Sequence, residues 1–167
     1  WPANIVSELS IANHLYFVTG DISTNLLWMM VATFFNKDLI NQYGLENPYD
    51  LVKNNQWTLD KMLEMCAGRY SDTDGAGTKD RGDTFGYALY NINADAFINA
   101  AGFTALKKDN TGHIIISPDM TDQRLYSLID KVGEFINGPD VFYENSTKVR
   151  DIFFEERSLF TTDRCFI

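Results

Sequence analysis

The most constraining part of the sequence covers residues 26–58, where apolar residues are followed by residues that end or begin helices. Residues 26–35 are almost continuously apolar, which favours a strand buried on both faces but leaves a buried helix open. A short amphipathic helix should then end at Gly44, since glycine adopts the left-handed conformation without steric cost. Pro48 should prevent that helix from resuming, and Thr58 should cap the next one. The stretch predicts a strand, a short helix, a loop and a second helix.

The rest of the chain alternates predicted strands and helices. The clearest helix covers residues 121–137, where apolar side chains recur at three- and four-residue steps before Gly138 and Pro139. Strands that alternate with helices predict a mixed α/β architecture. Further strands are expected at residues 14–18, 85–90, 113–116 and 159–162, further helices at 94–101 and 147–155, and a hairpin turn at 107–112.

Composition excludes several functional classes. A chain of 167 residues fits one domain with a substantial core, and 45% hydrophobic residues indicate a packed globule. The net charge of -9 argues against binding to nucleic acid, because phosphate contacts require clustered Lys and Arg. It also disfavours an anionic membrane surface. The longest apolar run has about half of the ~20 residues that a membrane-spanning helix requires.

The two cysteines, Cys66 and Cys165, are too few and too far apart for a disulfide framework or a four-ligand zinc site. Two buried free thiols are favoured over a bridge, because free cysteine behaves as a small hydrophobe.

No catalytic constellation stands out. His14 and His113 are the only histidines, and no Gly-x-Ser-x-Gly motif or phosphate-binding glycine-rich loop is present. The adjacent Glu155 and Glu156 are typical of a solvated helix end, and nothing places two carboxylates across a cleft. We therefore expect a protein that is not an enzyme.

The loop at residues 72–83 has the spacing of an EF-hand-type calcium-binding loop. Carboxylates stand at loop positions 1, 3, 9 and 12 and glycine at position 6, although Ala76 offers no side-chain oxygen at position 5. A solvated acidic turn is the alternative, because long loops also use Asp and Gly. If the ion binds, it should be a structural Ca²⁺ with the candidate ligands Asp72, Asp74, Thr78, Asp80 and Asp83.

Several short segments occur in a characteristic order. FFNKDL, GLENP and WTLDK follow one another within residues 34–61, HLYFV lies upstream at 14–18, and DTFGYAL and FFEERSLF lie downstream at 83–89 and 153–160. Their order and approximate spacing resemble the extracellular solute-binding proteins of ABC importers, the sugar-binding family 1 related to maltose-binding protein. The resemblance covers most of the chain.

The resemblance implies an α/β lobe of the type II periplasmic-binding-protein-like fold, with a mixed sheet flanked by helices. Family members have two lobes, so we expect this chain to be a fragment that covers most of the second lobe. Residues 1–20 would lead in from the first lobe, and residues 21–167 would form the single α/β lobe. The parent protein would be a cell-surface lipoprotein or a periplasmic protein, with its anchor or signal outside this chain.

The resemblance also implies a function. The chain would belong to the substrate-binding component of an ABC transporter, which captures an extracellular solute, here an oligosaccharide, and delivers it to the permease subunits in the membrane. The surface normally covered by the first lobe would be exposed, so the fragment is expected to self-associate.

The cleft-facing positions of the family fall at three places in this sequence. They lie near the end of the first strand and in the apolar run, in the loop after residue 90, and near residue 165, where relatives carry a ligand-stacking aromatic residue. Core packing is the alternative at each position, and Phe34, Phe35 and Trp57 are expected to lie in the core. The candidate ligand-binding residues are Asp21, Trp28, Asn91, Asn93, Asp95, Phe97, Arg164 and Phe166.

Two other functions stay open. A calcium-stabilised carbohydrate-binding module of a secreted glycan-degrading enzyme would share the acidic composition and the aromatic residues. Such modules are usually all-β sandwiches, however, and the helix expected at residues 121–137 disagrees with that fold. A hydrolase domain would use carboxylates for general acid–base catalysis.

Overall fold

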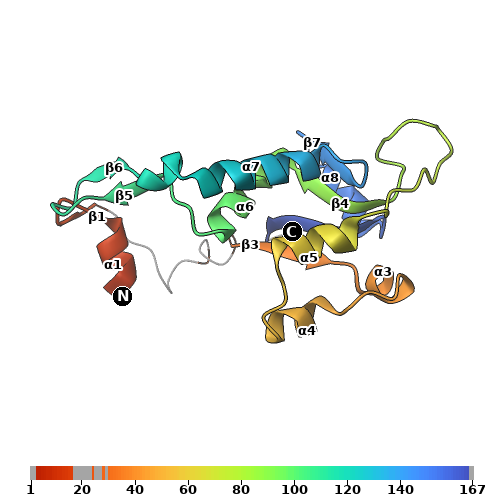
Figure 1. Ribbon diagram of the computed structural model, residues 1–167, viewed down its shortest axis with the longest axis horizontal. Coiled ribbons are helices and arrows are strands. Elements are labelled where there is room, and N and C mark those ends of the chain that lie inside the picture. The colour runs from red at the N-terminus through yellow and green to blue at the C-terminus, as the bar shows by residue number, and fades with distance from the viewer. Residues whose placement is uncertain (1–2, 17–23, 25–27, 29, 166–167) are drawn as a thin grey trace.

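The computed structural model describes residues 3–16, 24, 28 and 30–165. At its centre lies a four-stranded sheet with the strand order β3-β8-β4-β7 (Figure 1). Its strands are β3 Val31–Phe35, β4 Phe85–Tyr90, β7 Val141–Glu144 and β8 Ser158–Arg164. β8 is antiparallel to β3 and parallel to β4, and β4 is also parallel to β7. The sheet is therefore mixed, as predicted from the sequence.

Helices cover both faces of this sheet. They are α5 Leu59–Cys66, α6 Asp95–Ala100, α7 Gln123–Ile136 and α8 Val149–Phe154. On one face, Tyr87 and Leu89 belong to a buried cluster with α5, and Phe97 of α6 and Phe135 of α7 pack against it. On the other face, Ala88 packs with α8. The predicted α/β class, with helices flanking a mixed sheet, is confirmed.

The helix boundaries follow local sequence signals. The helix α3 Lys37–Gln42 begins after Asn36, whose side chain accepts two backbone N–H groups of the first turn. Gly44 follows its end with φ +62, the left-handed conformation expected there. α5 begins after Thr58, whose Oγ1 accepts a backbone N–H at 3.1 Å. The predicted helix end at Gly44 and the predicted cap at Thr58 are confirmed, whereas the cap at Asn36 was not predicted.

The prediction for Pro48 is wrong. Pro48 begins a further helix, α4 Pro48–Lys53, instead of preventing one. Proline is tolerated at the first helical position, because its missing N–H would have no partner in the helix there. Asn47 supplies the cap, since its Oδ1 accepts the backbone N–H of Tyr49 at 2.9 Å.

The strands differ from the predictions in two places. The apolar run was expected to form a strand buried on both faces, yet β3 begins only at Val31, forms an edge of the sheet, and leaves Val31 46% exposed. Residues 26, 27 and 29 of this run lie outside the described residues. β7 was not predicted, because its four residues are too few to show a periodic pattern.

The β-hairpin is confirmed and lies away from the sheet (Figure 1). It consists of β5 Leu106–Lys108 and β6 Ile114–Ile116, and the 3₁₀ turn η2 Pro118–Thr121 connects it towards α7. We call β5, β6 and η2 the arm, and the four-stranded sheet with α3 to α8 the body. The predicted helices at 94–101, 121–137 and 147–155 correspond to α6, α7 and α8.

The first described residues lie beside the arm. They form α1 Ala3–Leu9 and a short hairpin of β1 Ser10–Ile11 and β2 His14–Leu15, where the sequence predicted a strand at 14–18. The ammonium group of Lys108 donates to the carbonyl oxygen of Glu8 at 2.8 Å. This contact joins α1 to β5.

The two cysteines have different environments. Cys66 is a buried free thiol, as expected, and burial raises the pKa of its thiol. Cys165 is also free but exposed, so the prediction of two buried thiols is wrong there. It directly follows the last residue of β8, and its backbone N–H donates to the carbonyl oxygen of Met30 at 2.8 Å. No helix among the described residues is long and apolar enough to cross a membrane.

Candidate functional site

A groove lies where the parallel strands β4 and β8 end. α6 follows β4 through the 3₁₀ turn η1 Asn91–Asn93, and Thr162 lies near the end of β8, opposite Thr33 of β3. Two adjoining cavities of about 440 and 400 Å³ share Thr33, Phe97 and Ala100, so they form one groove. In open α/β sheets, ligands bind outside the carboxyl ends of the strands. The groove has this position.

The floor of the groove carries hydroxyl groups. Thr33 Oγ1 and Thr162 Oγ1 are 2.9 Å apart, and Tyr87 Oη forms a hydrogen bond with Thr162 Oγ1. Tyr87 is fully buried, and burial raises the pKa of its phenol. A chain of hydroxyls therefore extends from the core to the exposed Thr33. These groups can exchange donor and acceptor roles with a ligand hydroxyl.

The walls of the groove are mostly apolar. Trp57 precedes α5 and packs on Phe160 with ring centroids 5.7 Å apart. Phe97 projects from α6 towards Tyr87, at a centroid distance of 6.2 Å. Both aromatic residues line the groove, together with Leu59, Met62, Ala100, Ala101 and Leu128. Apolar walls with a few polar groups are typical of sites for small molecules.

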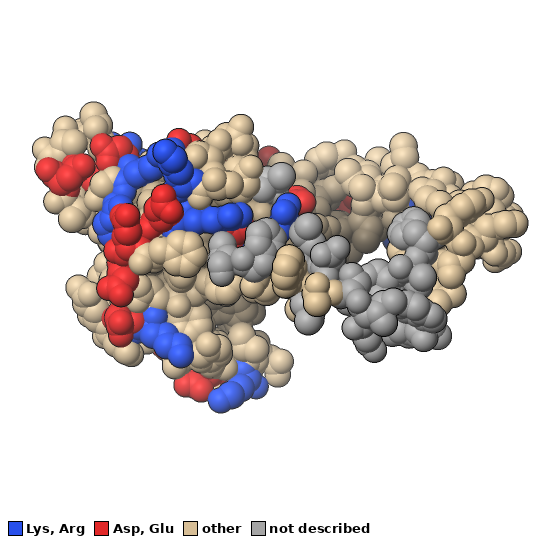
Figure 2. Space-filling view, turned by 180° about the vertical axis from the view of Figure 1, so that it is seen from behind, with Lys and Arg blue, Asp and Glu red and all other residues tan. Residues whose placement is uncertain are grey.

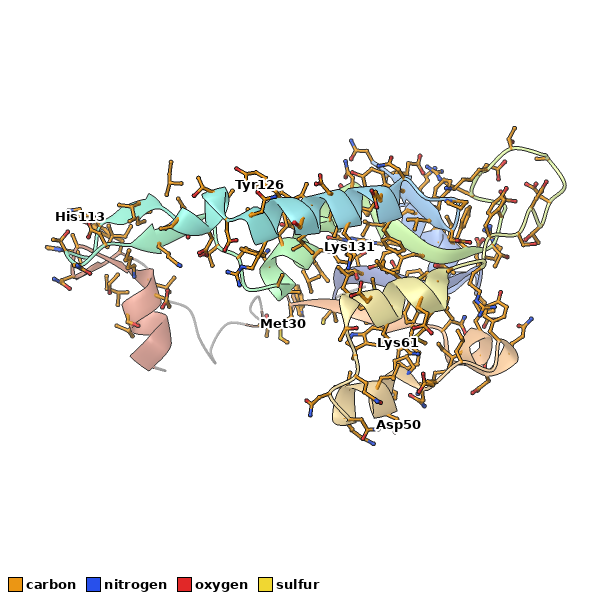
Figure 3. The ribbon with its side chains drawn as sticks, viewed as in Figure 1. Met30, Asp50, Lys61, His113, Tyr126 and Lys131 are labelled. Atoms are coloured by element: carbon orange, nitrogen blue, oxygen red, sulfur yellow. The ribbon has the colours of Figure 1, made fainter. Side chains whose placement is uncertain are left out.

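Charged and amide groups stand at the rim. The exposed Asp95 and Asn99 line the part of the groove beside β3. Outside the groove, the ammonium group of Lys131 on α7 pairs with Asp60 on α5 (Figure 3). This exposed ion pair should add at most ~1 kcal/mol, but it joins two helices that both contribute lining residues to the groove.

The structure brings some of the predicted ligand-binding residues to the groove. Asp95 and Phe97 line it. Asn93 is buried and supports the floor of the groove instead of lining it. Its Nδ2 donates to the carbonyl oxygen of Thr162 at 3.0 Å. Asn91 begins the turn η1 and is not among the lining residues.

The other predicted ligand-binding residues either are not among the residues that line the groove or fall outside the described part of the chain. Trp28 is 56% exposed and Arg164 ends β8, and neither is among the residues that line the groove. Asp21 and Phe166 lie outside the described residues.

Sequence reasoning missed Thr33 and Trp57 as lining residues. Trp57 was assigned to the core, and one part of it does pack on Phe160 while another lines the groove. Thr33 has a hydroxyl group within an otherwise apolar run, and this could have indicated a polar role for it. Its partner Thr162 is 129 residues away, so the pair is not visible in any local pattern.

The acidic loop forms a second candidate site. One ligand atom from each of Asp72, Asp74 and Asp83 lies within 4.8 Å of the others, so these three residues could hold a metal ion. Asp72 accepts the backbone N–H groups of Gly75 and Gly77 at 2.7 and 3.0 Å. These bonds fold the loop around the carboxylate.

The third carboxylate, Asp83, is fully buried. It accepts the backbone N–H groups of Thr73 and Asp80, each at 3.1 Å, and the hydroxyl of Tyr70 at 3.2 Å. Burial by itself would raise the pKa of Asp83, but these hydrogen bonds hold the pKa below its ordinary value. The carboxylate is therefore charged at neutral pH, as a metal ligand must be.

Three of the five predicted metal ligands thus lie together. Asp80 is not in the group, and its Oδ1 accepts the backbone N–H of Gly82 at 2.7 Å. Thr78 stays a prediction. Gly82 lies directly beside the cluster, because a Cβ atom at this position would be 2.2 Å from Asp74 Oδ2 and would displace that side chain.

No family model, curated protein or solved structure matches this chain. A functional assignment therefore depends on the groove and on the acidic cluster.

Proposed function

We propose that this chain is a solute-binding lobe of an extracellular receptor for an ABC importer, with a type II periplasmic-binding-protein-like fold, and that its groove binds an oligosaccharide. The observation that carries the proposal is the groove at the ends of β4 and β8. It combines aromatic walls, Trp57 and Phe97, with a floor of threonine hydroxyls.

The chemistry of a sugar matches these two surfaces. A pyranose ring has apolar C–H faces, which bury area against aromatic rings, and equatorial hydroxyls, which require hydrogen-bond partners. Thr33 Oγ1 offers both a donor and acceptor positions. Asp95 and Asn99 at the rim add an acceptor carboxylate and an amide. The groove can therefore satisfy both parts of the ligand.

The groove is open on one side, and in this proposal a second lobe provides the opposing wall. Closure of two lobes around a ligand by a hinge is a common conformational change in binding proteins. The closed, liganded form would then dock on the permease subunits. Half of a cleft buries only half of the ligand surface, so we expect this chain alone to bind saccharides weakly.

The alternatives fit the groove and fold less well. Carbohydrate-binding modules usually pack two antiparallel sheets, whereas this body has one mixed sheet between helices. Glycoside hydrolysis normally requires a pair of carboxyl groups. Asp95 is the one carboxylate among the described residues that line the groove. We therefore propose binding without catalysis.

We also propose that Asp72, Asp74 and Asp83 bind a structural Ca²⁺. Hard cations prefer carboxylate oxygens, and a carboxylate can accept more bonds than the backbone N–H groups use here. The loop connects α5 to β4, and its cluster lies away from the residues that line the groove. The ion would fix the loop and take no part in ligand binding.

Saturation-transfer NMR with a panel of mono- and oligosaccharides tests the binding proposal, because the method detects weak ligands. We expect saturation of the protein to reach the sugar protons of at least one oligosaccharide. Phe97→Ala should remove most of this signal by deleting one aromatic wall. Phe154→Ala is the matched control, since Phe154 is 58% exposed on α8 at the other face of the sheet.

Two results would contradict the proposal. One is the absence of saturation transfer to every saccharide in the panel. The other is a signal that Phe97→Ala and Phe154→Ala change equally, which would place the sugar elsewhere on the chain.

A further inference from the structure

The arm exposes an apolar edge strand. Its three consecutive isoleucines, Ile114, Ile115 and Ile116, are 46%, 42% and 75% exposed, and Leu106 on β5 is 59% exposed. Among the described residues, β6 pairs with β5 alone. In Figure 1, β6 forms the outer border of the arm, whereas α1 and β1 lie on the side of β5. An exposed apolar edge of this kind is a template for pairing with another strand.

The backbone groups of β6 alternate in direction. The hairpin bonds from Asp109 N to His113 O and from Ser117 N to Ala105 O are both 2.9 Å long. Hydrogen-bonded pairs alternate with non-bonded pairs in an antiparallel ladder. Ile115 is therefore bonded to β5, while the N–H and C=O groups of Ile114 and Ile116 point away from it. These outward groups are available to a further strand.

We propose that β6 pairs with β6 of a second copy of this chain, antiparallel and about a two-fold axis at Ile115. Ile114 of each copy would face Ile116 of the other, and the two residues would exchange N–H···O bonds. Because the apolar segment reads the same in both directions, this pairing matches isoleucine with isoleucine on both faces. Such an isologous contact uses the same surface of both copies, so assembly stops at the dimer.

The charges of the chain favour this edge over other contacts. A net charge of -9 makes two copies repel each other in general, but β6 has no charged residue. On the face seen in Figure 2, charged side chains gather over the body, and few are visible on the right of that view, where the arm lies. β6 is thus a segment where two copies can approach without placing charged side chains of the strand against each other.

The lysines of β5 do not oppose the pairing. Lys107 is paired with Asp119 at 3.1 Å, and Lys108 bonds to the carbonyl oxygen of Glu8. In the dimer, the two β5 strands would be three strand spacings apart, about 14 Å. This distance exceeds the screening length of about 8 Å at physiological salt.

The size of the contact indicates a weak dimer. A stable interface buries about 800 Å² per partner, more than a three-residue strand provides. Additional apolar surface lies next to it on η2 and α7, where Met120, Tyr126 and Ile129 are 39%, 47% and 45% exposed. Figure 3 shows Tyr126 on the border of α7 that continues from β6. We expect dimers at micromolar concentrations that dissociate on dilution.

Sedimentation velocity over a range of concentrations tests the proposal with charge-swapped variants. Ile115→Lys and Ile115→Glu should each be monomeric, because like charges would face each other across the axis. An equimolar mixture of the two should form dimers again. The control Val52→Lys changes an apolar residue of α4 that is 57% exposed, and it should dimerise like the unmodified chain.

A cross-linking variant gives a second, independent measurement. Ile115→Cys in a Cys165→Ser background places two thiols opposite each other in a non-hydrogen-bonded pair, with Cα atoms about 4.5 Å apart. That distance permits a disulfide, so mild oxidation should convert the chain to covalent dimers.

Several outcomes would overturn the proposal. These are an unmodified chain that stays monomeric at all concentrations, a mixture of charge-swapped variants that stays monomeric, or an Ile115→Cys chain that does not cross-link. Loss of dimers in Val52→Lys would locate the contact on another surface, and growth beyond dimers would contradict the closed two-fold arrangement.

Discussion

The body and the arm use the same apolar residues with opposite results. Ile152 in the body is fully buried, whereas Ile116 in the arm is 75% exposed. The difference in exposure follows from the number of packed layers. The body encloses its sheet between helices, whereas the arm is a single two-stranded layer. A two-stranded hairpin is at best marginally stable by itself. Burial, rather than residue type, decides where this chain gains its stability.

Polar groups show the same contrast. In the body, Asp163 is buried and pairs with the guanidinium group of Arg150. Among the described residues, no buried side-chain nitrogen or oxygen lacks a hydrogen-bond partner. In the arm, the pair between Lys107 and Asp119 is partly exposed, with 51% and 23% of the two side chains accessible. Ion pairs of the second kind contribute little.

The largest expected effect is on the free energy of unfolding, when an isoleucine of the body is truncated and compared with an isoleucine of the arm. Ile152→Ala should lower the free energy of unfolding by about 2–5 kcal/mol, because it leaves a cavity in a packed core. At concentrations low enough for the chain to be monomeric, Ile116→Ala should change it by about 0.5 kcal/mol or less, since the side chain is then exposed to solvent. Urea titration followed by tryptophan fluorescence measures both. Equal effects would mean that the arm is packed in solution.

Calcium gives the next effect in size and should act through the body alone. An ion that binds only the folded state adds about 2.7 kcal/mol at a hundredfold excess over its Kd. Thermal unfolding with calcium and with chelator should therefore differ by several degrees. Asp74→Asn should reduce this difference, whereas Asp109→Asn in the turn of the arm should not. A Tm that does not change with calcium would contradict the proposed metal site.

The smallest expected effect is a pH dependence that separates Asp83 from Asp119. The pKa of each carboxyl lies below its ordinary value of 3.8 in the folded chain. A lowered pKa stabilises the fold above 3.8, and this contribution is lost as the pH falls through the folded pKa. The loss of stability that Asp83→Asn causes should therefore be largest at neutral pH and shrink in acid.

Salt distinguishes the two aspartates further. The bond from Lys107 contributes most to the lowered pKa of Asp119. At the buried Asp83, the larger lowering effects come from neutral donors, the N–H groups of Asp80 and Thr73 and the hydroxyl of Tyr70, and the charge of Arg157 contributes least. Added salt screens exposed charges. It should weaken the effect of Asp119→Asn and leave that of Asp83→Asn nearly unchanged. Equal salt sensitivity would contradict this assignment.

Helices with local signals were predictable from the sequence. Gly44 and Thr58 mark helix ends by their own backbone and side-chain chemistry, and the period of α7 needs no knowledge of its neighbours. Pro48 was misjudged because proline either blocks a helix or begins one, depending on the cap before it. β7 was missed because four residues show no period.

The candidate sites were predictable to the extent that they are local. Asp72, Asp74 and Asp83 lie within one loop, so their spacing indicated that they converge. The groove depends on strands that are far apart in sequence. Phe97 was predicted from a family resemblance, whereas Thr33 lines the groove only because β3 pairs with β8.

The position of β8 has a consequence for how the chain folds during synthesis. β8 lies between β3 and β4, and within this sheet β3 has no other neighbour. Yet β8 is made last of the four strands, and Thr33 must wait for a partner 129 residues later. Ribosomes add about 5–20 residues per second, so the edges of β3 and β4 stay unpaired for several seconds or more. A nascent chain in this interval is a natural client for chaperones that shield open strand edges.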